Sequence, residues 1–411
     1  MRPTVLIATA SCWFPTARLA MALASAGCTV DAVCPARHPL AAMNAVRQTH
    51  SYKGLMPLRS FRNAIAATKP DFIIPGDDLA TYHLHHLYDQ ERRRGKQGQS
   101  ICTLIERSLG SADNFSAVYA RSVFINLARE AGIRAPKTEV IANLDELRKW
   151  AAETGFPTVL KANGTSGGDG VRVVHTLEEA ERAFRVLQAP PLLARAVKRA
   201  VVDHDKTLVW PSLLRHRSVV NAQVFVPGRE ATSTVACWEG KILAGLHFEV
   251  INKRDAAGPS SVVRLTENSE MVTAAEKMAR RLNLSGVHGF DFMLEVHTGN
   301  AHLIEINPRS TQVGHLALGP GRDLPAALYS AWSGEPFHAA PKVTESDIVA
   351  LFPQEWIRDP SSSFLATAYH DVPWGEPELL RACLRKRSKQ SPERFRENPV
   401  QALAPVRLPR L

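Results

Sequence analysis

A glycine-rich loop between two apolar runs, FPTVLKANGTSGGDGVRVVH from Phe156 to His175, most constrains the fold of this chain. The first run carries Lys161, whereas a Walker-type loop has its lysine after the last glycine, on a helix. The run after Gly170 is apolar and β-branched, so it predicts a second strand and not the helix that follows a dinucleotide-binding turn. We therefore expect the loop to join two antiparallel strands.

The composition of this loop suits phosphate binding. Gly164, Ser166, Gly167 and Gly168 can offer backbone N–H groups to phosphate oxygens. Lys161, on the preceding strand, would add a positive charge to the same phosphates. A flexible hairpin tip is the alternative that the loop alone leaves open.

A second hairpin is predicted in GFDFMLEVHTGNAHLIEINPRS, residues 289–310. Asp291 lies on its first strand, and Glu305 and Asn307 share one face of the return strand because they are two residues apart. Two carboxylates and an amide oxygen are ligands that Mg²⁺ takes, usually together with substrate phosphates. Arg309 could meet an anion beside the metal. A surface hairpin with ordinary polar faces is the alternative.

The first 76 residues alternate between strands and helices. Strands are predicted in TVLIAT, TVDAVC and DFIIPG, and helices in ARLAMALASAG and SFRNAIAATK. This alternation is typical of a parallel sheet, which binds ligands beyond the C-terminal ends of its strands. Asp77 and Asp78 follow such an end, where they either cap the next helix or contact a substrate. The stretch SCWFPT, residues 11–16, follows the C-terminal end of another predicted strand and is a second candidate for the substrate pocket.

The middle of the chain is harder to assign. The charged segment 89–99, DQERRRGKQGQ, predicts a mobile surface stretch, and one helix is expected over residues 115–132. The basic segment 195–217 has no clear structure or role. From residue 218 onward strands dominate, interrupted by one helix over residues 269–283.

Charge and cysteine usage exclude several classes of protein. The formal charge is +10, and residues 381–410 hold nine Lys or Arg against two Glu, which predicts a solvated basic tail. We expect no nucleic-acid partner, because base stacking needs aromatic side chains interleaved with the charges. No run approaches the roughly 20 apolar residues of a membrane helix. Six scattered cysteines without a CxxC pair indicate reduced thiols and a cytoplasmic protein.

Taken in order, these motifs resemble the ATP-grasp superfamily, and the resemblance covers most of the chain. It implies an α/β fold in which an N-terminal parallel-sheet domain precedes a two-lobed ATP-grasp fold with an α+β lid and a small C-terminal extension. The N-terminal domain is expected over residues 1–112 and the central lobe with the lid over residues 113–222. The C-terminal lobe with the metal site is expected over residues 223–340, and the extension with its basic tail over residues 341–411.

The resemblance also implies roles at the phosphates. Arg121 stands where the family has a basic residue that meets the nucleotide phosphates; most members have Lys there, whereas carbamoyl-phosphate synthases use Arg. Lys161 corresponds to the second phosphate-binding lysine, with the glycine-rich loop as the lid. Arg309 corresponds to the arginine expected near the acyl phosphate, so Arg309 and Lys161 are the candidate catalytic residues.

The remaining implied roles concern adenosine and metal. A hinge strand would hold adenine through backbone groups, and a carboxylate after it would grip the ribose hydroxyls; many members have Glu where this chain has Gln223. The hinge residues would be Gln223, Val224, Phe225 and Val226, and Glu230 would bind the ribose. The metal ligands would be Asp291, Glu305 and Asn307.

The function implied by the resemblance is that of an ATP- and Mg²⁺-dependent ligase, with Mn²⁺ as an alternative metal. Such an enzyme activates a small carboxylate as an acyl phosphate and joins it to an amine, releasing ADP and phosphate. Two alternatives stay open: a catalytically silent ATP-binding sensor, and a carbamate-activating enzyme resembling carbamoyl-phosphate synthase. The sequence does not name the carboxylate or the amine, and it leaves open whether the chain forms a homodimer.

Overall fold

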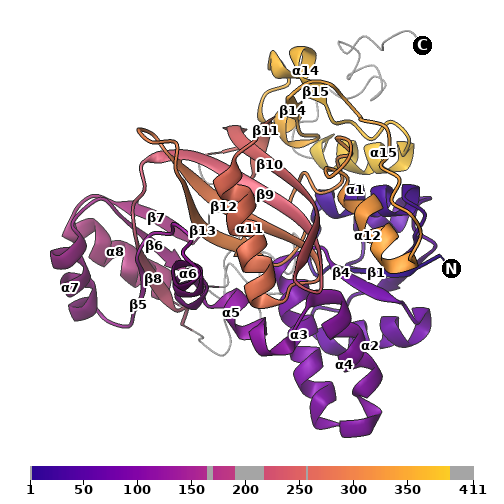
Figure 1. The fold of residues 1–411 in the computed structure, drawn as a ribbon, viewed down its shortest axis with the longest axis horizontal. Helices are drawn as coiled ribbons and strands as arrows, with labels where there is room; N and C mark the ends of the chain where they lie inside the picture. Colours follow the sequence, from indigo (N-terminus) through magenta and orange to yellow (C-terminus); the bar gives the residue numbers. More distant parts are fainter. Residues whose placement is uncertain (1, 164–169, 190–216, 256–257, 389–411) are drawn as a thin grey trace.

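The computed structural model describes residues 2–163, 170–189, 217–255 and 258–388, and all structural statements refer to them. This part of the chain forms a four-stranded parallel sheet, a four-stranded antiparallel sheet and a seven-stranded sheet, each accompanied by helices (Figure 1). None of the helices described is both long and apolar enough to span a bilayer.

The N-terminal sheet has the strand order β3-β2-β1-β4 with every neighbour parallel, as predicted. Alternate residues of β1 serve two cores: Val5 and Ile7 pack on the side of α1, and Leu6 and Ala8 on the side of α2, α3 and α4. The elements are β1 (Thr4–Ala8), α1 (Phe14–Ser25), β2 (Thr29–Cys34), β3 (Gln48–Ser51), α2 (Pro57–Thr68), β4 (Phe72–Pro75), α3 (Asp78–Arg93) and α4 (Gln99–Leu109). The sequence does not signal β3, because its residues QTHS lack apolar alternation.

The prediction of a mobile stretch over residues 89–99 is wrong. Helix α3 and a 3-10 turn lead directly into α4. Glu91 is fully buried, and its carboxylate forms ion pairs with Arg62 at 2.5 Å and Arg94 at 2.8 Å. The run of charges therefore contains an ion-paired helix connection, which hydropathy alone does not distinguish from a solvated loop.

The small antiparallel sheet has the order β5-β8-β6-β7. Lys161 on β6 lies opposite Val171 on β7, so the prediction that the glycine-rich loop joins two antiparallel strands is confirmed. Trp150 of α7 and Phe184 of α8 are buried against Leu160 in the core of this lobe. The elements are β5 (Thr138–Ile141), α7 (Leu144–Thr154), β6 (Thr158–Ala162), β7 (Val171–Val174), α8 (Leu177–Gln188) and β8 (Val220–Val224).

The single helix expected over residues 115–132 is two helices, α5 (Phe115–Tyr119) and α6 (Arg121–Glu130). Ala120 between them has a ψ of 91°, an extended conformation that interrupts the helical hydrogen bonding. Neither Gly nor Pro marks the break in the sequence. The interruption makes Arg121 the first residue of a helix.

The large sheet has the order β13-β12-β9-β10-β11-β14-β15 and is antiparallel except for its last pair. Apolar side chains of β9, β12 and β13 pack against α6 and α11, so the alternate side chains of these strands face away from that core. The elements are β9 (Gly228–Trp238), β10 (Lys241–Lys253), β11 (Ser260–Leu265), α11 (Ser269–Leu282), β12 (Gly286–Glu295), β13 (Ala301–Asn307), α12 (Leu324–Ser333), β14 (Ile348–Ala350) and β15 (Tyr369–His370).

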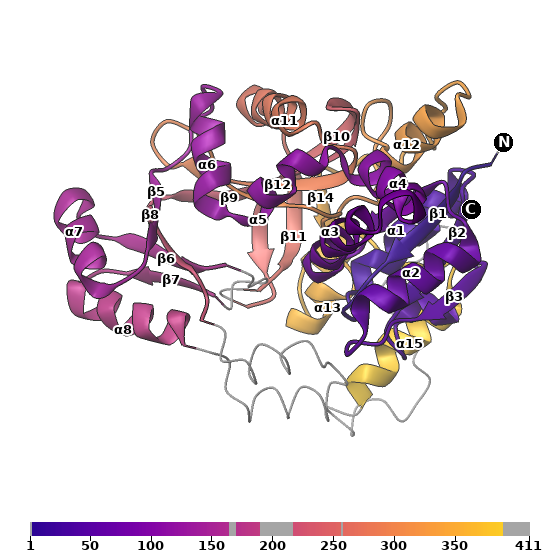
Figure 2. The ribbon, with the colours of Figure 1, turned by 90° about the horizontal axis from the view of Figure 1, so that it is seen from below.

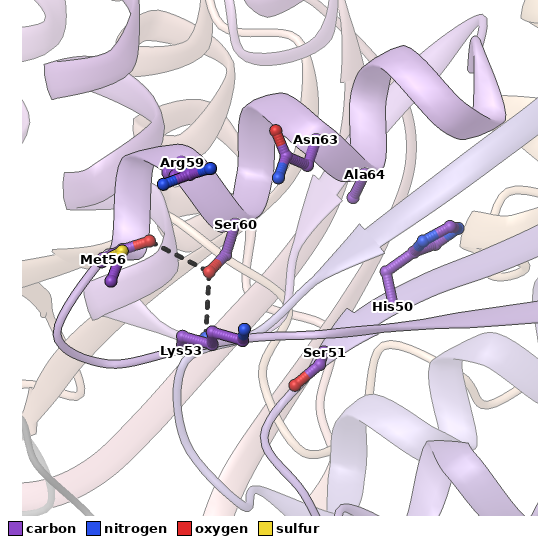
Figure 3. A pocket seen from close by; sticks show the side chains of 8 residues that line it. All are labelled: His50, Ser51, Lys53, Met56, Arg59, Ser60, Asn63 and Ala64. Carbon is purple, nitrogen blue, oxygen red and sulfur yellow. Dashed lines mark hydrogen bonds between the residues drawn. The ribbon is translucent and has the colours of Figure 1, made fainter.

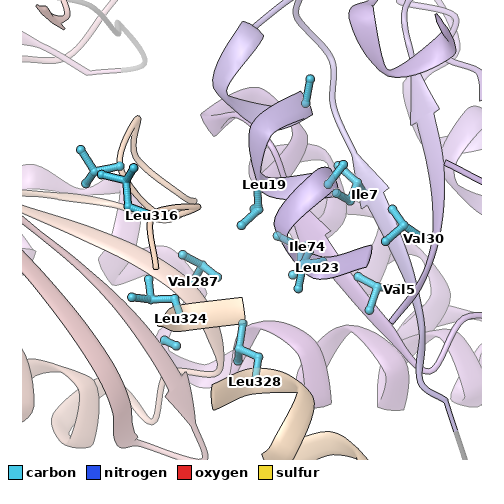
Figure 4. Close-up of a cluster of buried hydrophobic side chains, with 14 of the residues drawn as sticks. Val5, Ile7, Leu19, Leu23, Val30, Ile74, Val287, Leu316, Leu324 and Leu328 are labelled. Carbon is cyan, nitrogen blue, oxygen red and sulfur yellow. The ribbon is translucent and has the colours of Figure 1, made fainter. Parts of the chain in front are cut away.

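One hydrophobic core joins the N-terminal sheet to the large sheet (Figure 4). Complete burial of an aliphatic side chain contributes about 1.5–3 kcal/mol, so this interface fixes the two sheets relative to each other. Its fully buried members include Val5, Ile7, Leu23, Ile74, Leu324 and Leu328.

The segment after residue 340 is built into the same body. Strand β14 extends the large sheet, and α13 (Gln354–Arg358), α14 (Phe364–Thr367) and α15 (Pro377–Ser388) follow it. Asp371, just after β15, forms a buried ion pair with Arg18 of α1, and its Oδ2 lies within hydrogen-bonding distance of His315 Nε2, at 2.7 Å. The predicted domain boundaries stay a proposal, and the one after residue 222 falls inside β8.

Asp77 connects the ends of two parallel strands. Its Oδ1 accepts a hydrogen bond from the backbone N–H of Ala80 at 2.8 Å, which caps α3. Its Oδ2 accepts from the backbone N–H groups of Ala10 and Ser11, at 2.8 and 3.0 Å. The side chain is buried, so it holds the loop after β1 against the start of α3.

Asp77→Ala should lower the free energy of unfolding by about 3 kcal/mol, because buried donors left without an acceptor cost about 1–3 kcal/mol each. Asn143→Ala is the matched control, since Asn143 caps the exposed start of α7 through Glu146 alone, and such a change costs about 1 kcal/mol. Urea unfolding followed by circular dichroism measures both. Equal losses would show that the bonds to the β1 loop contribute nothing.

Candidate active site

A cavity of about 450 Å³ lies where the β6–β7 hairpin, the large sheet and the loops after β1 and β4 meet. Figure 2 shows β6 and β7 running toward the large sheet from the side opposite the N-terminal sheet. Acidic and basic side chains both line this cavity, four of each. These side chains are Asp78, Arg121, Lys161, Glu230, Lys253, Asp291, Glu305 and Arg309.

Two carboxylates face each other at the centre of the cavity. Asp291 on β12 pairs directly with Glu305 on β13, as the alternating pattern predicts. Asp291 accepts hydrogen bonds from Thr232 Oγ1 at 3.0 Å and from Asn307 Nδ2 at 2.8 Å. Burial, followed by the charge of Glu305, raises the pKa of Asp291 to about 6. Because like charges out of water repel, a cation between the two carboxylates would lower their energy.

The donor set at this point is two carboxylates and one amide. Within the described ranges, no three His, Cys, Asp or Glu side chains lie close enough together to share a metal ion. A site built from Asp291, Glu305 and Asn307 therefore has few protein ligands. That number suits Mg²⁺, which usually keeps waters and takes further oxygens from substrate phosphates.

Lys161 reaches the same cavity from β6. Its side chain is buried, and it forms no hydrogen bond or ion pair with the rest of the described chain. Burial lowers its pKa to about 8, with Glu305 acting in the opposite direction and Arg121 in the same one. Burying an ammonium group without an anionic partner costs free energy, and a ligand with an anionic group would offset that cost.

Arg121 contacts the carboxylate pair directly. Its Nη2 lies 2.8 Å from Glu305 Oε1, and both side chains line the cavity. The break at Ala120 starts α6 at Arg121 and so places the guanidinium at this end of the helix. Arg121 thus lies beside the carboxylates as well as beside Lys161, the second predicted phosphate ligand.

Arg309 lies at the side of the cavity formed by the N-terminal sheet. Its guanidinium is 4.9 Å from the centre of the Trp13 ring, and its Nε is 3.1 Å from Asp78 Oδ2. Its Nη2 donates to Asn307 Oδ1 at 3.3 Å. Of the two aspartates in PGDD, Asp77 is the helix cap, and Asp78 lines the cavity.

The predicted adenosine-binding residues are only partly brought to the cavity. Glu230 lines it and pairs with Lys253 at 2.7 Å. Gln223 lies within β8, where its Nε2 donates to Thr138 Oγ1 at 2.9 Å. None of residues 223–226 is among those that line the cavity, so their role at adenine stays a prediction.

The predicted phosphate-binding glycines and serine, Gly164, Ser166, Gly167 and Gly168, lie outside the residues that the structure describes, as does most of the basic segment 195–217. Their roles stay predictions.

Five polar residues of the cavity were missed in the sequence: Thr232, Lys253, Ser260, Thr311 and Gln312. Thr232 is two residues after Glu230 on β9, so extending the alternation along that strand would have found it. Lys253 ends β10 and meets Glu230 only because β9 and β10 pair, which no local pattern indicates.

A second cavity, of about 340 Å³, lies at the start of α2 (Figure 3). Ser60 Oγ donates to Met56 O and accepts from Lys53 N there, which ties the loop before α2 to the helix. The cavity has no carboxylate, and most of its side chains are exposed. The charged cavity is therefore the candidate active site. The residues around the second cavity are His50, Ser51, Lys53, Met56, Arg59, Ser60, Asn63 and Ala64.

Comparison with known proteins gives consistent matches. The family model for the carbamoyl-phosphate synthase L chain ATP-binding domain matches residues 120–317. The carbamoyl phosphate synthase large chain of Pasteurella multocida is 22% identical over 232 residues, which are 56% of this chain and 20% of the relative. The chain thus spans about a fifth of the length of that relative.

Solved structures show the same fold over a longer part of the chain. An N5-carboxyaminoimidazole ribonucleotide synthetase in complex with ADP matches with a TM-score of 0.57 and 16% identity, covering 83% of this chain and 79% of that one. The biotin carboxylase domain of the Hydrogenobacter thermophilus 2-oxoglutarate carboxylase, a dimer in complex with MgADP, ADP and bicarbonate, matches with a TM-score of 0.57 and 15% identity, covering 83% and 71%.

The family model spans a little under half of the chain and covers both the β6–β7 hairpin and the strands that carry the carboxylates. The solved neighbours share the fold over about four fifths of the chain. These matches agree with the resemblance to the ATP-grasp superfamily that the sequence motifs show.

Proposed function

We propose that this protein is an ATP- and Mg²⁺-dependent ligase that activates a small carboxylate as an acyl phosphate and joins it to an amine, releasing ADP and phosphate. One observation carries the proposal: Lys161, a buried cation whose side chain forms no hydrogen bond or ion pair with the described residues, shares a cavity with the facing carboxylates Asp291 and Glu305. A metal-bound triphosphate would supply both missing charges.

The residues at the centre of the cavity fit a hard divalent cation. Asp291, Glu305 and Asn307 would hold Mg²⁺ or Mn²⁺ through oxygen atoms. Burial, followed by repulsion from Glu305, raises the pKa of Asp291, and a cation would relieve that repulsion. When bound, the metal would neutralise charge on the phosphates during transfer.

The basic side chains would position the reacting groups. Lys161 and Arg121 would contact the phosphates, with the undescribed loop residues Gly164, Ser166, Gly167 and Gly168 as the lid. Arg309 would bind the carboxylate and then the acyl phosphate. Its contacts with Trp13, Asp78 and Asn307 hold the guanidinium in place before substrate arrives, and such pre-organisation is a main source of catalysis in phosphoryl transfer.

Known relatives support this reaction class. The neighbours whose names include ADP or MgADP share the fold over about four fifths of the chain, and one of them is a dimer. Glu230 would bind the ribose and residues 223–226 the adenine. A homodimer and small carboxylate and amine substrates are part of the proposal. The sensor alternative is less favoured, because Lys161 and the carboxylate pair are all in the cavity.

Activation of bicarbonate or carbamate is a second candidate, favoured by the family model and by the neighbour that binds bicarbonate. A phosphate-release assay with ATP, Mg²⁺, and paired small carboxylates and amines tests the ligase, and bicarbonate belongs in the same panel. Phosphate release with bicarbonate alone would favour the second candidate. Tight ATP binding without phosphate release from any pair would favour the sensor.

Replacing Glu305 by Gln should remove the metal dependence of ATP binding. In the wild type, EDTA should weaken ATP binding measured by isothermal titration calorimetry, because the carboxylates then repel the phosphates. In E305Q the effect of EDTA should disappear, and substrate-dependent ADP formation should fall about 100- to 1000-fold, as electrostatic groups at such sites contribute about 3–4 kcal/mol. Glu345→Gln, at an exposed surface pair with Lys342, is the matched control. Equal EDTA effects in wild type and E305Q would remove the metal site from the proposal.

Replacing Lys161 by Ala should weaken ATP binding about 10- to 150-fold, because a hydrogen bond to a charged group contributes about 1.5–3 kcal/mol. Lys149→Ala, at an exposed position on α7, controls for the loss of one surface charge. The shift in melting temperature on adding ATP and Mg²⁺ measures the effect. A shift equal to that of the wild type would place Lys161 outside the nucleotide site.

ATP affinity should fall as pH rises above 8, because the pKa of Lys161 is about 8 and only the protonated ammonium attracts phosphate. The loss should approach about tenfold per pH unit between the pKa of Lys161 in the free protein and its pKa in the complex, which phosphate binding raises, and it should level off above the pKa of the complex. Lys161→Arg keeps its charge throughout this range and should abolish the dependence. Titration calorimetry at several pH values compares the two proteins, and parallel curves would contradict the assignment.

A further inference from the structure

The strand register orders the charged residues along the cavity. On β9 and β13, Glu230 lies opposite Met293 of β12, and Asn307 lies opposite Gly289. These β12 positions are four residues apart, about 13 Å along the strand, with Asp291 between them. Along the strands, the carboxylate pair of Asp291 and Glu305 therefore lies between Glu230 at one side of the cavity and Arg309 at the other. If the nucleotide occupies the Glu230 side, the carboxylate and amine substrates occupy the Arg309 side.

Asp78 is the acidic side chain on that side. Its neighbour Asp77 is fully used as the helix cap, whereas the Asp78 side chain is 35% exposed and lines the cavity. Among the described residues its ion pair is with Arg309, at 3.1 Å. Asp78 thus lies directly beside the group that would bind the acyl phosphate.

The other acidic side chains of the cavity have different partners. Glu305 is paired with Arg121 at 2.8 Å. Asp291 accepts from Thr232 and Asn307, and Glu230 pairs with Lys253 on the nucleotide side. None of these contacts involves Asp78.

Two titratable groups interact with Asp78 among the described residues. Arg309 lies 3.1 Å from it, and the charge of Asp78 acts on the phenol of Tyr119. Burial, followed by the charge of Asp78, raises the pKa of Tyr119, so this neighbour stays neutral. Trp13, beneath Arg309, closes the same side of the cavity.

We propose that Asp78 binds the ammonium group of the amine substrate and accepts one of its protons, an inference that rests on the ligase function proposed above. The amine must arrive next to the acyl group held at Arg309, and in neutral water it arrives as a cation. A carboxylate 3.1 Å from Arg309 places the two binding groups side by side, which brings nitrogen and carbonyl carbon into reacting distance.

The bond changes then balance without a further reactant. The ammonium gives one proton to Asp78, and the free amine attacks the carbonyl carbon of the acyl phosphate. A carbon–nitrogen bond forms while the bond from that carbon to the phosphate oxygen breaks. The phosphate leaves with the electron pair and takes the second proton, so the products are the amide and hydrogen phosphate. Asp78 returns its proton to solvent.

Hydroxylamine provides the test, because it traps acyl phosphates as hydroxamates and is largely uncharged at neutral pH. Wild type and Asp78→Asn are incubated with ATP, Mg²⁺ and a panel of small carboxylates, with either hydroxylamine or a panel of primary amines and amino acids. The ratio of amine-dependent to hydroxylamine-dependent product should fall at least about 100-fold in D78N, the lower range for general acid–base catalysis. Asp78→Glu should restore part of it. Asp113→Asn, an exposed surface change, should leave it unchanged.

Each outcome separates the two proposals. Hydroxamate formation by the wild type supports the ligase, and its absence with every carboxylate overturns the ligase and the role of Asp78 together. An unchanged ratio in D78N overturns the role of Asp78 alone. If the wild type forms hydroxamates but does not use any primary amine, the role of Asp78 is also overturned, because the second substrate is then not an ammonium ion. If D78N does not fold by circular dichroism, Asp78→Ser is compared with Asp78→Glu by the same ratio.

Discussion

The facing carboxylates of Asp291 and Glu305 are the constraint around which this site is built. Their direct opposition in the β12–β13 register keeps two negative charges close together out of water, which is unfavourable by itself. Hydrogen bonds from Thr232 and Asn307 and the ion pair with Arg121 offset part of this cost. Under the proposed function, a bound cation would relieve the remaining repulsion, so the strand register would favour a metal at this point.

The opposite charge is carried by a different sheet. Lys161 belongs to the small antiparallel sheet, whereas the carboxylates belong to the large one. Within the described residues, no contact neutralises Lys161. A ligand with both bound cation and phosphate oxygens would therefore connect the two sheets electrostatically. The N-terminal sheet, by contrast, is fixed to the large sheet by a hydrophobic core, so its loops face the carboxylates in a set position.

Local patterns predicted the parts of the site that depend on one hairpin. The period of two along a strand places Glu305 and Asn307 on one face, and the apolar, β-branched run after Gly170 predicts the antiparallel pair. The pairings between distant segments could not be predicted in this way. Arg121 and Glu305 are 184 residues apart, and their contact depends on a helix break without Gly or Pro. The buried Glu91 likewise looked like part of a solvated charge run, because its partner Arg62 lies on another helix.

The two aspartates of PGDD show how a sequence ambiguity is resolved by the fold. Asp77 caps α3, as one alternative predicts, whereas Asp78 lines the cavity, and its contact with a substrate stays a prediction. Asp77 also binds the backbone of Ala10 and Ser11, so one buried carboxylate holds the loop that carries Trp13 against the start of the helix that carries Asp78. The Asp78 side of the cavity is thus formed by loops at the C-terminal ends of parallel strands, where such sheets bind ligands. Under the proposed function, those loops would determine which amine enters without altering the register that holds the carboxylates.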